Sequence, residues 1–194
     1  HVVADSHPVT DSSAATRNDS ADITRQFDWY MEKTTPAGQT TLTRSADDRV
    51  ANESFIHWNN REYTLNSTLQ LDESGMVIEQ TITGVSPFGA PIDESFKWQG
   101  GEASWKTVGE GGKITSSEAA FYLPTEWASV GALEAMVQAA ARNPNGELAL
   151  FPQGRARVEK MTRTEVETPE GSVTLSLWAI FGTGFTPNFA WFDD

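Results

Sequence analysis

Residues 63–71 of the chain read YTLNSTLQL, and this stretch decides the fold. Large apolar residues stand at Tyr63, Leu65, Leu69 and Leu71, and they alternate with polar residues such as Asn66. A period of two residues is typical of a β-strand that has one buried face and one solvated face. The stretch therefore predicts a long antiparallel strand.

The same alternation continues on both sides of this strand, and turn sequences interrupt it. Residues 72–75 (DESG), 87–91 (PFGAP) and 99–102 (QGGE) predict turns because they are rich in glycine, proline and aspartate. Asn59 and Asn60 predict a further turn, since asparagine tolerates a positive φ angle. The meander is therefore expected to extend through residues 63–106, and the glycine-rich residues 109–112 (GEGG) after it are expected to be a flexible linker. Further strands are predicted at residues 27–31, 39–44, 50–58, 119–123, 147–151, 155–166 and 173–177.

One segment has the period of a helix instead. Thr125 is a suitable N-cap, and residues 142–146 (RNPNG) form a suitable end. Apolar residues recur on one face between these two points, at Trp127, Val130, Leu133, Met136, Val137, Ala140 and Ala141.

These patterns predict a mainly β fold of the α+β type. We expect a curved antiparallel meander sheet that could form a half-barrel, covered by one amphipathic helix over about residues 125–142. Residues 23–194 are predicted as one antiparallel β domain. Residues 1–22 lack periodicity and large apolar side chains, so we expect a disordered tail.

Charge and composition exclude several classes of function. The 194 residues carry a formal net charge of -13, which argues against nucleic acid as a partner because a phosphate backbone requires a basic patch. There are no cysteines, so disulfides and thiolate metal sites are excluded. No apolar run approaches the roughly 20 residues of a membrane helix, so no membrane insertion is expected.

The seven tryptophans are the unusual part of the composition. The first interpretation is that they fill a wide core between the sheet and the helix, as large aromatic residues most often do. The second is that the curved sheet encloses a cavity for an apolar ligand. In that second case the cavity would be lined by Trp29, Trp98, Trp105, Trp127 and Trp178.

The residues themselves specify no reaction. His1, His7 and His57 lack the spacing of a zinc site, and no Gly-x-Ser-x-Gly elbow is present. Asp93 and Glu94 are the most interesting acidic pair, but neighbours on a strand point to opposite faces and cannot act together without a bulge. We expect His57 to be a half-buried strand residue. No catalytic residue, metal ligand or cofactor site is predicted in this chain.

Five short motifs carry a resemblance to a known family. They are residues 90–96 (APIDESF), 100–106 (GGEASWK), 120–124 (AFYLP), 148–154 (LALFPQG) and 184–193 (GFTPNFAWFD). In this order they resemble the β-rich N-terminal region of secreted bacterial proteins of the amidohydrolase family, in which this region precedes a metal-dependent hydrolase barrel. The family's metal ligands are histidines and an aspartate on barrel strands, and no matching motif occurs here.

The resemblance implies a non-catalytic accessory domain of a secreted or periplasmic amidohydrolase that cleaves amide or peptide bonds. Its partner would be the catalytic barrel, in cis or as a separate chain, and a divalent metal such as zinc is expected only in that barrel. In this interpretation the barrel would begin at the aromatic segment 180–191. The chain could also form an oligomer. The alternative is a periplasmic carrier of a lipid or acyl chain, which resembles the lipoprotein-carrier half-barrel.

Overall fold

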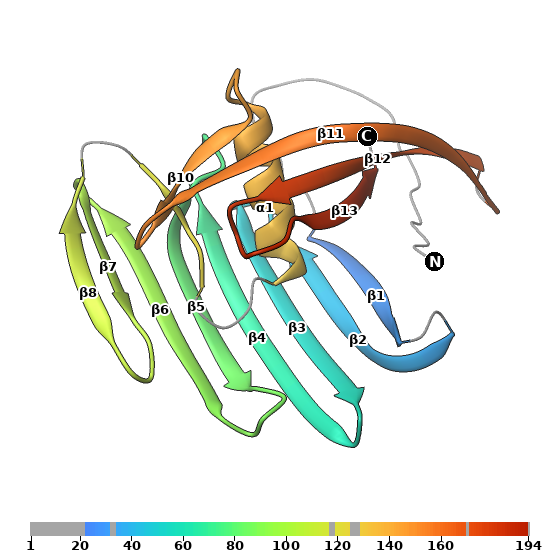
Figure 1. The fold of residues 1–194 in the computed structure, drawn as a ribbon, viewed down its shortest axis with the longest axis horizontal. Coiled ribbons are helices and arrows are strands. Elements are labelled where there is room, and N and C mark those ends of the chain that lie inside the picture. The colour runs from blue at the N-terminus through green and yellow to red at the C-terminus, as the bar shows by residue number, and fades with distance from the viewer. Residues whose placement is uncertain (1–21, 32–33, 117–118, 125–128, 170, 194) are drawn as a thin grey trace, which may run out of the picture.

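The computed structural model describes residues 22–31, 34–116, 119–124, 129–169 and 171–193. Over these residues the fold is mainly β with one short helix, and the predicted curved antiparallel sheet forms a half-barrel (Figure 1). The predicted tail at residues 1–22 lies almost wholly outside the described residues. The elements are β1 (Ile23–Met31), β2 (Thr35–Arg44), β3 (Arg49–Trp58), β4 (Arg61–Leu71), β5 (Val77–Val85), β6 (Pro91–Gln99), β7 (Glu102–Lys106), β8 (Gly111–Thr115), β9 (Phe121–Tyr122), α1 (Val130–Ala141), β10 (Glu147–Phe151), β11 (Arg155–Thr168), β12 (Gly171–Phe181) and β13 (Asn188–Asp193).

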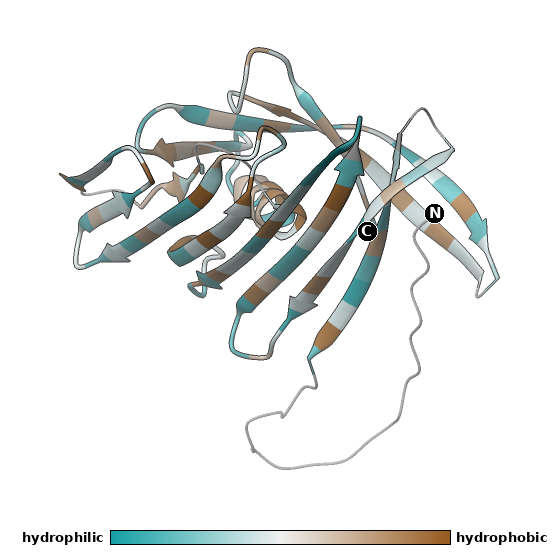
Figure 2. Ribbon diagram, turned by 90° about the horizontal axis from the view of Figure 1, so that it is seen from below, coloured by the Kyte–Doolittle hydropathy of each residue, from teal (hydrophilic) through white to brown (hydrophobic). Residues whose placement is uncertain are grey.

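The first sheet is a meander in which each of β1 to β8 pairs antiparallel with the next strand. The predicted turns are confirmed: Asn59 and Asn60 both have positive φ angles, of 49° and 58°, between β3 and β4. At the turn after β4, the Asp72 carboxylate accepts hydrogen bonds from the backbone N–H groups of Ser74 and Met76. The strands alternate between hydrophilic and hydrophobic residues, as Figure 2 shows.

Two features allow the first sheet to curve. Register shifts occur between Trp29 and Tyr30 and between Gln70 and Leu71, and such bulges increase the local twist. Gly84 on β5 also lies so close to β4 that a Cβ atom there would stand 2.0 Å from the Thr64 carbonyl oxygen. A glycine in a strand often marks a close approach of this kind.

Helix α1 lies on the concave side of the first sheet (Figures 1 and 2). It begins at Val130, because the Ser129 side chain accepts a hydrogen bond from the Ala132 N–H and acts as the N-cap. The prediction of a helix from about residue 125 with Thr125 as N-cap therefore placed the start too early, and residues 125–128 lie outside the described residues. Gly131 lets the helix approach the sheet, since a Cβ atom there would stand 2.7 Å from side-chain atoms of Leu42 and Val50.

The strands after the helix, together with the short strand β9 before it, form a second sheet, and alternation alone did not predict that this sheet is separate from the first. Its order is β13-β12-β11-β10-β9, and the short strand β9 pairs parallel with β10. This sheet lies across the open side of the half-barrel, over the helix (Figure 1). The main core lies between the layers, where Phe96 on β6 stacks on Tyr122 with ring centroids 4.6 Å apart.

Residues 109–112 were expected to be a flexible linker, and this was wrong for the second half of the segment. Gly111 and Gly112 begin β8, which pairs with β7. The Trp105 ring lies against Gly112, where an added Cβ atom would stand 2.4 Å from it. Gly112 therefore allows this tryptophan to pack against an edge strand.

Candidate functional site

The structure places four of the five predicted cavity residues in two different clusters. Trp98, Trp105 and Trp178 are partly buried against the main core, and the Trp98 ring lies 5.5 Å from that of Phe151. Trp29 packs instead against a smaller cluster on the first sheet. Trp127 lies outside the described residues. The cavity role of these residues stays a prediction, and the four described ones border packed side chains.

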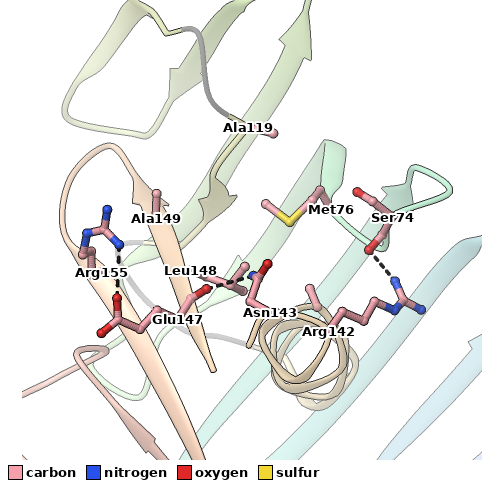
Figure 3. A pocket seen from close by; sticks show the side chains of 10 residues that line it. Ser74, Met76, Ala119, Arg142, Asn143, Glu147, Leu148, Ala149 and Arg155 are labelled. Atoms are coloured by element: carbon pink, nitrogen blue, oxygen red, sulfur yellow. Dashed lines mark hydrogen bonds and ion pairs between the residues drawn. The ribbon is translucent and has the colours of Figure 1, made fainter. Parts of the chain in front are cut away.

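A pocket of about 340 Å³ opens where the C-terminal end of α1 meets β10 (Figure 3). Its polar groups are largely paired with one another: Arg142 donates to the Ser74 carbonyl oxygen, Asn143 donates to the Glu147 carbonyl oxygen, and Arg155 lies 3.3 Å from the Glu147 carboxylate. None of the four described tryptophans of the predicted cavity lines it. These contacts connect the turn after β4 to the helix end and to β10, which is a structural role.

Asp93 and Glu94 point to opposite faces of β6, as predicted. Asp93 is exposed, whereas Glu94 is only 3% exposed and lies on the concave side with Phe96. The Tyr122 hydroxyl donates a hydrogen bond of 3.1 Å to Glu94 Oε2. Burial, the negative charge of Glu94 and this hydrogen bond all raise the pKa of Tyr122 above its ordinary value of 10.0.

The raised pKa of Tyr122 predicts a loss of stability at alkaline pH. Above about pH 10 the unfolded chain releases the phenol proton while the folded chain retains it, so the free energy of unfolding falls by up to ~1.4 kcal/mol per pH unit for this group. Urea unfolding from about pH 9 to about pH 11 should show a shallower decline for Tyr122→Phe than for the wild type. Parallel declines for the two proteins would contradict this assignment. Burial also raises the pKa of Tyr63, so the Tyr63→Phe variant measures the contribution of that tyrosine separately.

The second sheet has an exposed apolar face on the side away from the core. Opposite residues of antiparallel strands share a face, and Leu177 lies opposite Trp191 while Ala179 lies opposite Phe189. Phe189 is 62% exposed and Trp191 is 47% exposed. We call this surface the outer aromatic face; its members are the exposed Phe189 and Trp191 and the half-buried Leu175, Leu177 and Phe181, and they surround Ala179, which is fully buried.

The other face of the same two strands is covered. Ile180 belongs to the main core, and Trp178 and Phe192 pack against it. On the outer aromatic face, the Arg157 guanidinium lies 4.4 Å from the centroid of the Phe181 ring, and Arg157 also pairs with Glu159. Aromatic residues and arginine are enriched in protein interfaces relative to the rest of a protein surface.

The described residues contain no group of three or more His, Cys, Asp or Glu side chains that could hold a metal ion. His57 is exposed on β3, with its Nδ1 atom 3.5 Å from the Glu62 carboxylate, so the expectation of a half-buried residue was wrong. His1 and His7 lie outside the described residues. Among the described helical residues, none forms a helix long and apolar enough to span a membrane.

These observations define a half-barrel with a covering second sheet and an exposed aromatic sheet face. The chain matches no family model, no curated protein and no solved structure.

Proposed function

We propose that this chain is a non-catalytic accessory domain of a secreted or periplasmic metal-dependent amidohydrolase. The five motifs of the resemblance support the family, and the outer aromatic face supports the role of a docking domain. In this proposal the catalytic barrel covers that face, either in cis or as a separate chain, and the barrel holds the divalent metal.

The outer aromatic face is the observation on which the proposal rests. Monomeric proteins seldom expose a contiguous apolar patch of this kind without a use for it. Phe189 and Trp191 also lie on β13, which ends the strand order of the second sheet and presents a backbone edge. A partner that covers this face would therefore bury aromatic rings and shield the edge together.

A double variant Phe189→Ser and Trp191→Ser should fold like the wild type and bind the barrel at least about tenfold more weakly, since buried aromatic anchors carry much of an interface's affinity. The measurement is calorimetric titration of the chain with the recombinant barrel from the same reading frame or operon. Phe185→Ser is the matched control, because Phe185 is exposed outside β13 and its loss should leave the affinity unchanged. Equal affinities for the wild type and the double variant would contradict docking through this face.

The non-catalytic part of the proposal has a separate test. The purified chain, supplied with zinc or manganese, is expected to hydrolyse peptide and amide substrates no faster than a blank. Hydrolysis that survives purification to homogeneity would refute it. The proposal also expects the reading frame, or a neighbouring one, to encode a barrel that carries a His-x-His motif.

The curvature of the first sheet favours a second candidate, a periplasmic carrier of a lipid or acyl chain. Carriers use the concave side of such a sheet, where Trp29, Trp98 and Trp105 would report on an apolar ligand. In this chain, however, the concave side is covered by α1 and the second sheet, and the stacked rings of Phe96 and Tyr122 fill the space between them. Titration with a fatty acid, followed by tryptophan emission, distinguishes the two candidates.

A further inference from the structure

A band of buried polar side chains crosses the concave face of the first sheet. It runs over β2 to β6, and its members are between 0% and 9% exposed. It separates the main core from two smaller apolar clusters, one around Ile56 and one around Ile82. We call it the polar band; its members are Thr40, Asn52, Ser54, Ser67, Gln80 and Glu94.

Both ends of the polar band are hydrogen bonded. At one end Trp29 Nε1 donates to Thr40 Oγ1 at 2.7 Å, Thr40 and Ser54 share a hydrogen bond of 2.8 Å, and Asn52 Nδ2 donates to Ser54 at 2.9 Å. At the other end Tyr122 donates to Glu94. The polar groups at these ends therefore have partners within the chain.

Four polar atoms in the middle of the band have no such partner. Asn52 Oδ1, Ser67 Oγ and both amide atoms of Gln80 are buried and make no hydrogen bond to any described residue. These three side chains are neighbours, because Asn52 lies directly opposite Ser67, and Gln80 lies diagonally across from Ser67 on the next strand. Turning the Asn52 amide would exchange its two atoms but would still leave one of them unpaired.

A buried polar group without a partner is costly, so four such atoms in one place favour a small molecule bound between them. The atoms include both acceptors and donors, and all three side chains are neutral. A cation would lie against the donor groups and an anion against the acceptor oxygens. Burying either charge here would also be unfavourable. The complementary ligand is therefore a small neutral molecule that both donates and accepts hydrogen bonds.

We propose that the middle of the polar band is a binding site for internal water. Buried water molecules make about three hydrogen bonds each, to polar groups that would otherwise be unsatisfied. The unpaired atoms of Asn52, Ser67 and Gln80 supply that set. Water here would extend the hydrogen-bonded path that begins at Trp29 on β1 through Asn52 and Ser67 to Gln80 on β5.

Two measurements on the whole chain test this site. A high-resolution crystal structure is expected to show solvent density within about 2.7–3.2 Å of polar atoms on at least two of the three side chains. An empty site, a protein side chain in this position, or density for an organic molecule would overturn the assignment to water.

Magnetic relaxation dispersion of water counts long-lived internal molecules in solution and serves as the second measurement. Gln80→Met keeps the length of the side chain and removes its hydrogen bonds, so the long-lived water signal should fall relative to the wild type. Ser67→Ala should also lower the long-lived water signal. Ser86→Ala is the matched control, since Ser86 is also buried but accepts hydrogen bonds from the backbone N–H groups of Phe88 and Ala90. An unchanged signal in folded Gln80→Met and Ser67→Ala proteins would refute the site.

Discussion

Phe96→Ala is expected to lower the free energy of unfolding by about 3–5 kcal/mol. Phe96 is 2% exposed, and it stacks on Tyr122 of β9 with an interplanar angle of 10°. Its ring centroid also lies 5.9 Å from that of Phe151 on β10. Its removal therefore leaves a cavity where the first sheet, the second sheet and the helix layer meet.

Urea unfolding followed by tryptophan emission and circular dichroism gives this number, and thermal unfolding should show a midpoint lower by on the order of 10 °C. Phe96→Leu should lose less, because it restores part of the volume. Phe185→Ala is the control: the side chain is fully exposed, so the change should stay within about 0.5 kcal/mol. Similar losses for Phe96→Ala and Phe185→Ala would mean that the ring does not join the layers.

The sequence was sufficient to predict the first sheet because its strands are amphipathic and its turns are local. The alternation in residues 63–71 assigned Leu65 and Leu69 to the buried face, and both are buried. The turn at Asn59 and Asn60 depended only on the φ angles that asparagine tolerates. Each of these features is decided within a few residues, so no tertiary information was needed.

Strands β10 to β12 of the second sheet were predicted, and each pairs with the next along the chain, but their separation from the first sheet and the pairing of β9 leave no local signal. Strand β9 pairs with β10 across the whole of α1, and its two residues carry no period that points to a parallel partner. In β13 both faces bear aromatic residues, so alternation could not tell that Phe192 would be covered while Trp191 would be exposed. The outer aromatic face therefore became visible only in three dimensions.

Glu94 illustrates a third case, in which a weak signal was present. It stands between Ile92 and Phe96 at the buried phase of β6, so the alternation places it inside. A carboxylate is seldom buried without a partner. The partner is Tyr122, which lies 28 residues away in the sequence, and no spacing rule connects the two. The polar band was missed for the same reason, since its members come from five strands.

The curvature of the first sheet leads to the second large effect: Gly84→Ala is expected to cost about 3 kcal/mol or more of the free energy of unfolding. Gly84 pairs with Leu65 on β4 and with Ile92 on β6, so it lies inside the sheet. An added Cβ atom would stand 2.0 Å from the Thr64 carbonyl oxygen and 3.2 Å from the Leu65 Cα atom. Both are backbone atoms of β4, which cannot rotate away, so the two strands must separate and weaken their ladder.

Gly109→Ala is the matched control, because it makes the same chemical change in the loop between β7 and β8. No heavy atom lies within 4 Å of the added Cβ atom there, so stability should change by no more than about 0.5 kcal/mol. Hydrogen exchange distinguishes the reason for any loss in Gly84→Ala: amides paired between β4 and β5 should lose protection more than those between β11 and β12. A uniform loss of protection over both sheets would instead mean that Gly84 matters through overall stability and not through the close approach of these two strands.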